Sequence, residues 1–224
     1  MKAYQIKIDM IDSEPSIWRS VVMPAGATFN RLHDVIQTVL NFQDYHLFEF
    51  DLTKDKIRVT NDEEAYQEHQ YFKKNQKEME KQMEEVLPEF AEFEKARLEQ
   101  LKKVVRKPNG IKIDSYLEKH GELYYIYDFG DDWRVLVTLE KVMENYHYGY
   151  PTLLTGEGTA PPEDVGGFMG YSEFLKIYHD PDHPDHEDMK TWANSQLYRE
   201  YDPEFISGML KFVKYKKTEW DNLR

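Results

Sequence analysis

Two short loops of this sequence place carboxylates beside aromatic residues, a combination that can bind cations. The first loop holds Asp128, Asp131 and Asp132 and leads into Trp133. Its Asp-Phe-Gly triplet also occurs in protein kinases, but the glycine-rich loop, lysine strand and His-Arg-Asp loop of a kinase do not precede it. Glycine and aspartate are residues that a hairpin turn favours. The triplet therefore predicts a turn that presents three carboxylates.

The second loop, residues 161–171, reads Pro-Pro-Glu-Asp-Val-Gly-Gly-Phe-Met-Gly-Tyr. The prolines stiffen it, and Gly166 and Gly167 allow the backbone to fold close against a neighbour. Backbone constraint explains every residue type except the adjacent carboxylates Glu163 and Asp164. Two interpretations stay open: packing against the protein's own sheet, which the residue types favour, and a ligand site.

A third cluster, residues 179–188, mixes imidazoles with carboxylates. His179, His183 and His186 could bind zinc, manganese or iron. Two prolines inside the cluster prevent a regular helix, so the spacing does not place the histidines on one face. A solvated loop that caps the next helix is the simpler interpretation. We expect no resident cofactor, with a divalent metal at this cluster as the alternative.

Several classes of protein are excluded by what the sequence lacks. It contains no cysteine, no serine in a Gly-x-Ser-x-Gly elbow and no Gly-Lys-Ser or Gly-Lys-Thr phosphate loop. The missing cysteines exclude disulfides and fit a reducing compartment. No apolar run approaches the roughly 20 residues of a membrane span, and the first twenty residues do not form a signal peptide's apolar block. We therefore expect a cytoplasmic protein without membrane association.

The net charge of −13 over 224 residues is concentrated in one part of the chain. Residues 157–206 hold twelve acidic and three basic residues, whereas residues 207–224 sum to +3. DNA affinity depends on lysine and arginine that neutralise phosphates, so direct nucleic-acid binding is disfavoured. An acidic face attracts cations and basic protein surfaces. We therefore expect a protein partner or a cationic ligand.

A sheet and one helix must position these loops. Period-two alternation predicts a hairpin from strands at 4–10 and 17–22. Apolar spacing of three and four predicts a helix over 29–40, with Thr28 as its N-cap. A strand over 46–52 completes a ββαβ order, and His46 at its start is expected to be a hydrogen-bonded boundary residue. A second hairpin over residues 124–139 surrounds the Asp-Phe-Gly turn and completes the sheet.

The remaining segments are predicted to be helices and one loop. Residues 61–107 alternate in charge and carry Phe and Met at threes and fours, which predicts a long helix or a helical hairpin. Pro88 does not decide between the two. The apolar seam fits internal packing, with oligomerisation as an alternative. Residues 151–170 are expected to form a loop, and helices are expected over 171–178, 188–197 and 203–215.

These motifs occur in order in one known family. The residues that carry the resemblance lie in 15–19, 46–50, 127–133, 161–167 and 170–171. The sequence resembles the plasmid pRiA4b ORF-3-like family, also labelled as mobile-element passenger proteins of the TnpR type.

The resemblance covers about 1–60 and 108–206. It implies one α+β domain over residues 1–224 with a ubiquitin-like β-grasp core. In that domain 61–107 is a helical insertion, and 157–224 is an acidic loop followed by C-terminal helices.

Three hypotheses about function follow. The first is a non-catalytic binding or adaptor protein with a rigid acidic and aromatic groove. Its candidate residues are Trp18, Arg19, His46, Asp128, Asp131, Asp132, Trp133, Glu163, Asp164, Gly166, Gly167 and Tyr171. The second is a metal-dependent hydrolase that uses the loop carboxylates with His46 or the 179–186 histidines. The third, an accessory of mobile-element DNA recombination, rests on the family label alone.

Overall fold

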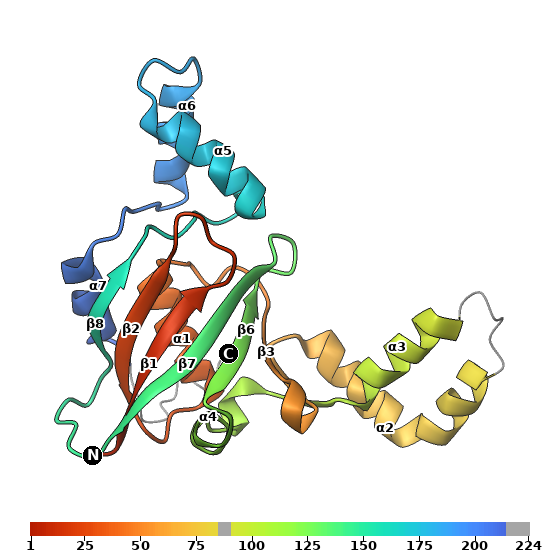
Figure 1. Ribbon diagram of the computed structural model, residues 1–224. Coiled ribbons are helices and arrows are strands. Elements are labelled where there is room, and N and C mark those ends of the chain that lie inside the picture. Colours follow the sequence, from red (N-terminus) through yellow and green to blue (C-terminus); the bar gives the residue numbers. More distant parts are fainter. Residues whose placement is uncertain (85–90, 214–224) are drawn as a thin grey trace.

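The computed structural model describes residues 1–84 and 91–213, and one eight-stranded sheet lies at its centre (Figure 1). The strands are β1 Ala3–Met10, β2 Trp18–Pro24, β3 Phe48–Leu52, β4 Ile57–Thr60, β5 Val104–Arg106, β6 Glu122–Tyr127, β7 Trp133–Met143 and β8 Thr152–Glu157. Their order is β5-β4-β3-β6-β7-β1-β2-β8. All neighbours are antiparallel except β4 and β5, which are parallel. The mixed α+β class is confirmed, and the β-grasp core stays a prediction.

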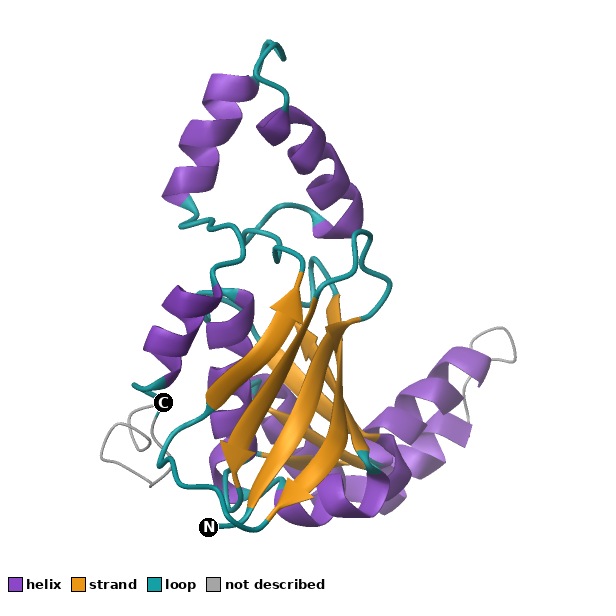
Figure 2. Ribbon diagram, turned by 60° about the vertical axis from the view of Figure 1, so that its left-hand side comes forward, coloured by secondary structure: helices purple, strands orange, loops and turns teal. Residues whose placement is uncertain are grey.

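Helix α1, Phe29–Leu40, packs its apolar side on the sheet. The Thr28 hydroxyl caps it by accepting a hydrogen bond from the Arg31 N–H at 3.3 Å, and Asn41 ends it at a φ of 58°. Its apolar residues Leu32, Val35, Ile36 and Val39 are fully buried. Each buried side chain of this size contributes about 1.5–3 kcal/mol to folding. Helix α7, Pro203–Leu210, lies on the same side of the sheet (Figure 2).

The expected loop over 151–170 is wrong in its first part, because Thr152–Glu157 forms the edge strand β8 beside β2. Gly156 explains the close pairing: a Cβ there would lie 2.6 Å from the Arg19 Cδ and 2.7 Å from the Trp18 carbonyl oxygen. Only glycine fits without movement of these neighbours. The short elements β4, β5 and α4, Asp114–His120, were not predicted from the sequence, since each is too short to show a periodic pattern.

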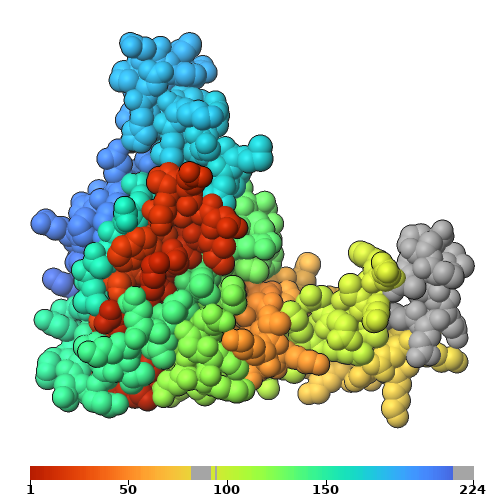
Figure 3. Space-filling view, viewed as in Figure 1, coloured from red at the N-terminus to blue at the C-terminus, as the bar shows by residue number. Residues whose placement is uncertain are grey.

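Residues 61–107 contain two helices that extend away from the sheet (Figures 1 and 3). Helix α2, Glu63–Glu84, has non-helical backbone at Asn75, and α3, Ala91–Lys102, returns beside it. Two ion pairs join them, Arg97 with Glu68 at 3.7 Å and Lys102 with Glu80 at 3.8 Å. The hairpin alternative therefore describes this segment better than one helix. The possible break at Pro88 lies outside the described residues, and a role in oligomerisation stays a prediction.

The acidic part of the chain forms an arm at one end of the sheet (Figures 1 and 2). It consists of α5, Gly167–His179, and α6, His186–Ser195. Helix α5 begins four residues before the predicted start, and α7 ends at Leu210 rather than at 215. None of the described helices has the length and apolar character needed to cross a membrane.

Candidate functional site: an imidazole among three carboxylates

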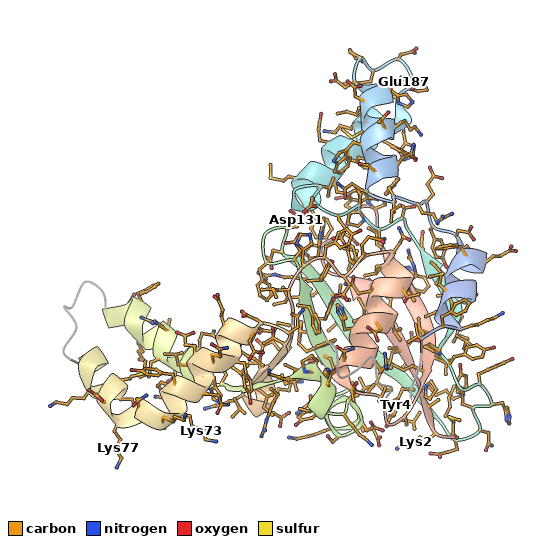
Figure 4. All side chains as sticks on the ribbon, turned by 180° about the vertical axis from the view of Figure 1, so that it is seen from behind. Lys2, Tyr4, Lys73, Lys77, Asp131 and Glu187 are labelled. Atoms are coloured by element: carbon orange, nitrogen blue, oxygen red, sulfur yellow. The ribbon has the colours of Figure 1, made fainter. Side chains whose placement is uncertain are left out.

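Three chain segments meet where the β6–β7 hairpin turns toward the arm. Strands β3 and β6 are antiparallel, with Phe48 opposite Tyr127, so the residues just before β3 lie beside those just after β6. The Asp128 N–H donates to the Leu47 carbonyl at 3.0 Å and extends this pairing. The loop of residues 161–166 crosses the same end before the chain enters α5 at Gly167. Figure 4 labels Asp131 at this junction.

The Asp-Phe-Gly segment is a tight turn, as predicted. Asp128 and Asp132 both adopt left-handed backbone, with φ of 54° and 55°. The Asp128 Oδ1 accepts hydrogen bonds from the N–H groups of Gly130 at 2.9 Å and Asp131 at 3.4 Å. This Asx-type bonding is what favours aspartate in turns. It leaves the second carboxylate oxygen of Asp128 free to face the neighbouring segment.

Glycines hold the second loop against this turn. The Gly166 N–H donates to the Asp131 carboxylate at 3.1 Å. Gly167 has a φ of 68°, and a Cβ there would lie 3.1 Å from the Asp131 carbonyl oxygen. A Cβ on Gly170 would lie 1.8 Å from the Val165 carbonyl oxygen. Packing thus explains the glycines, and it leaves the two preceding carboxylates to be explained.

Four side chains converge between the segments. The His46 Nε2 lies 3.2 Å from the Asp164 Oδ1, 3.6 Å from the Asp128 Oδ2 and 3.7 Å from the Glu163 Oε2. Both the His46 Nε2 and the Glu163 Oε2 are shielded from solvent, and neither has a hydrogen-bond partner among the described residues. Within that part of the chain, His46, Asp128 and Asp164 are also the group of ligand-type residues close enough to hold a metal ion.

Glu163 is the buried member of this cluster, with 1% of its surface exposed. Its Oε1 accepts hydrogen bonds from the Gln43 N–H at 2.6 Å and the Tyr127 hydroxyl at 2.9 Å. Burial raises the pKa of Glu163, and these two hydrogen bonds oppose that rise only in part. The Tyr127 oxygen also accepts from the Tyr45 N–H at 3.0 Å. One hydroxyl therefore positions both the carboxylate and the backbone next to His46.

The other residues predicted for these loops surround the cluster. Trp133 is fully buried and meets Phe168 edge to face at 5.0 Å between ring centres. Tyr171 is also buried, and its hydroxyl donates to the Thr159 carbonyl at 2.7 Å. Asp132 points outward and pairs with Arg134 at 2.8 Å. These side chains support the loops and do not enter the cluster.

Trp18 and Arg19 lie elsewhere in the fold. The Arg19 guanidinium is 1% exposed and donates to backbone carbonyls, including those of Val39 at 3.0 Å and Gly158 at 2.9 Å. It also lies over the ring of Tyr201 at 4.1 Å. Desolvation lowers the pKa of Arg19 to about 10. Arg19 therefore ties β2 to α1 and to the end of β8.

The histidines of the arm do not converge. The His186 Nδ1 lies 3.0 Å from the Ile177 carbonyl oxygen, and the His183 Nδ1 accepts from the Asp185 N–H at 3.1 Å. Both contacts are local caps of the loop between α5 and α6, which is the simpler interpretation of this cluster. A metal bound there stays a prediction.

A groove between α5 and α6 adjoins the cluster and was not predicted from the sequence. It has a volume of about 510 Å³. Apolar side chains form its floor: Val165, Phe174, Met189 and Trp192. Carboxylates form its rim: Asp164, Glu173, Asp185 and Asp188. The sequence contained one sign of this groove, because positions 185, 188, 189 and 192 fall on one face of a helix.

The family described as plasmid pRiA4b ORF-3-like protein matches residues 2–208. The chain belongs to this family. A family relative, the uncharacterized protein y4hQ of Sinorhizobium fredii, is 27% identical over 194 residues, covering 87% of this chain and 82% of y4hQ.

A solved structure of similar fold is the protein of unknown function MM3350 from Methanosarcina mazei Go1. It is 28% identical, has a TM-score of 0.64, and is matched over 91% of this chain and 96% of MM3350. Neither name states a ligand or a reaction. The matched range of the family includes the helices of residues 61–107, and their origin as an insertion stays an interpretation.

Proposed function

We propose that this pRiA4b ORF-3-like protein is a non-catalytic binding protein that docks a basic, partly apolar segment of a partner protein between α5 and α6. The observation that carries the proposal is the groove itself, with an apolar floor and carboxylates of both helices on its rim. A lysine or arginine would lay its methylene groups on Trp192 and Phe174. Its charge would then reach the rim, and the indole face adds a cation–π contribution.

The charges around the groove favour a cationic occupant. None of the residues that line it is lysine or arginine. Lys176 pairs with Glu173 at 3.0 Å, but both side chains are more than 60% exposed, so this ion pair contributes little and is readily exchanged. The Lys190 ammonium lies 3.6 Å from the centre of the Tyr178 ring, and neither residue lines the groove. An acidic site of this kind steers basic partners toward it and repels nucleic acid and anionic membranes.

The size and position of the groove favour a protein segment as its occupant. A volume of about 510 Å³ accommodates a few side chains. The arm that forms the groove projects from the body of the molecule, as the space-filling view shows (Figure 3). A partner could therefore approach it without contacting the sheet.

The test is fluorescence anisotropy with an end-capped peptide in which lysine alternates with leucine, measured in a chelating buffer. The Glu173→Gln, Asp188→Asn double variant removes one rim charge from each helix. Each exposed ion pair contributes about 0.2–1 kcal/mol, so the loss of two should weaken binding by about two- to thirtyfold, with about eightfold as the midpoint.

The matched control is Asp182→Asn with Glu187→Gln, which changes the net charge equally at residues that do not line the groove. We expect the control to bind the peptide within about twofold of wild type. Equal weakening in both double variants would show non-specific attraction and contradict the proposal. A peptide with glutamate in place of every lysine should bind more weakly, and equally tight binding of that peptide would also contradict the proposal.

The metal-dependent hydrolase and the accessory role in DNA recombination stay predictions, as does the cytoplasmic location. The β-grasp description of the core also stays a prediction. Binding of the basic peptide does not depend on any of them.

A further inference from the structure

We infer that His46, Asp128, Glu163 and Asp164 bind one divalent transition-metal ion. This site is separate from the groove and goes beyond the proposed function, although Asp164 lies at the edge of both. The argument rests on the spacing of the four side chains, on two buried atoms without partners, and on the types of ligand.

The spacing is that of ligands around a shared ion. Zinc and similar ions bind imidazole nitrogen and carboxylate oxygen at about 2.0–2.2 Å, so neighbouring ligand atoms lie about 3.0–3.5 Å apart at tetrahedral or octahedral angles. The three distances from the His46 Nε2 are 3.2, 3.6 and 3.7 Å. The two longer distances exceed those of hydrogen bonds. Ligand atoms of His46, Asp128 and Asp164 lie within 4.8 Å of one another, and the Glu163 Oε2, 3.7 Å from the His46 Nε2, would reach the same ion if its side chain moved.

A hydrogen bond does not explain the arrangement. The His46 Nε2 can carry at most one hydrogen, whereas three carboxylates from two segments surround it. The atom makes no hydrogen bond among the described residues, and neither does the Oε2 of Glu163, which is 1% exposed. Buried polar atoms normally have partners, and an unpaired one calls for an explanation such as an ion. A metal ion bonded to both the His46 Nε2 and the Glu163 Oε2 would explain why neither atom has a hydrogen-bond partner.

The electrostatics support a divalent cation. Asp128 and Glu163 are 7% and 1% exposed, and a carboxylate oxygen of each lies within 3.7 Å of the same imidazole nitrogen. Carboxylates held this close away from solvent repel one another unless a positive charge lies between them. Asp164 approaches from the solvent side, with 58% of its side chain exposed. An ion would therefore enter from that side.

The donor set selects the kind of ion. One imidazole with three carboxylates suits manganese, iron or zinc, because imidazole favours transition metals and carboxylate suits the harder ions among them. Glu163 is itself held in place, since the Tyr127 hydroxyl and the Gln43 N–H donate hydrogen bonds to its other carboxylate oxygen. Such outer contacts orient the ligands of metal sites.

The experiment is calorimetric titration of the full chain, made without a histidine tag and stripped with chelator, using Mn²⁺ and Zn²⁺ separately. We expect one ion per chain for at least one of the two metals. Glu163→Gln and His46→Gln should each weaken binding by more than tenfold. His46 is partly exposed, so His46→Gln keeps the test valid if the buried substitution impairs folding, which circular dichroism reports.

Asp132→Asn is the matched control, because this carboxylate belongs to the same turn and pairs with Arg134 outside the cluster. It should bind metal as wild type does. Absence of binding at millimolar concentrations of both metals would overturn the inference, as would unchanged affinity in the folded His46→Gln variant. The Glu173→Gln, Asp188→Asn variant should retain the metal, so failure of the groove proposal and failure of this one are distinguishable.

Discussion

Replacing Tyr127 with phenylalanine removes the hydroxyl that organises the candidate metal site. That hydroxyl donates to the Glu163 Oε1 at 2.9 Å and accepts from the Tyr45 N–H at 3.0 Å. The ring itself is fully buried and stacks near Tyr125, so the phenylalanine ring should keep the same packing. The substitution therefore loosens the carboxylate and the backbone before His46 and leaves all four proposed ligands in place.

The magnitude follows from the two lost contacts. Loss of an outer contact to a metal ligand typically lowers metal affinity by about 10- to 100-fold, which equals about 1.4–2.7 kcal/mol. In the metal-free protein the Glu163 carboxylate and the part-buried Tyr45 N–H each lose a hydrogen bond, at about 0.5–1.5 kcal/mol apiece and so about 1–3 kcal/mol together. We therefore expect a loss of about 2 kcal/mol in the free energy of unfolding of the Tyr127→Phe variant.

Calorimetry measures the first effect and urea unfolding the second. The control is Tyr146→Phe, because Tyr146 is a buried tyrosine whose hydroxyl also makes two hydrogen bonds, to the Tyr150 carbonyl and the Thr152 hydroxyl, both at 2.9 Å. It should lose comparable stability and retain full metal affinity. The reasoning is refuted if Tyr127→Phe binds metal within about threefold of wild type, or if the control weakens metal binding as much.

Two further predictions concern residues outside the cluster. Arg19→Met should lower the free energy of unfolding by about 3 kcal/mol, since it takes the donor from three buried or part-buried carbonyls at about 1 kcal/mol or more each. A loss below about 1 kcal/mol in urea unfolding would contradict this. Burial raises the pKa of Tyr171 to about 12. As the pH rises above about 10, the unfolded chain therefore loses this hydroxyl proton before the folded chain does. The free energy of unfolding should fall as the pH rises from about 10 to 12. Tyr171→Phe should reduce the slope of unfolding free energy against pH in this range, and an unchanged slope would argue against the assignment.

Local patterns were enough to predict much of the sheet and its main helix. The alternation over 4–10 and the spacing over 29–40 each repeat a buried face many times, and Thr28 supplies a cap within three residues of the N–H that it binds. Turn chemistry at Asp128 was equally local, because its partners are the next N–H groups along the chain. Elements of three or four residues, such as β5, carry no such repetition and were missed.

The sequence also identified all four members of the cluster as candidates without showing that they meet. His46 is separated from Asp128 and Glu163 by long stretches of chain, and only the antiparallel pairing of β3 with β6 brings the first two together. Arg19 shows the converse. Its motif suggested a site, yet its guanidinium donates to carbonyls of α1, of the end of β8 and of Gly158, and this makes it a structural residue.

The amino-acid sequence by itself thus determined which residues are apolar, capped or turn-forming, because these properties depend on neighbours within about one helical turn or one strand. The tertiary structure alone decided which polar groups lose their water and which of them find partners. That outcome depends on strand register and on loops that approach from distant parts of the chain. The unpaired Glu163 Oε2 beside the His46 Nε2 is a property of this kind, since neither residue is unusual until the fold buries both atoms together.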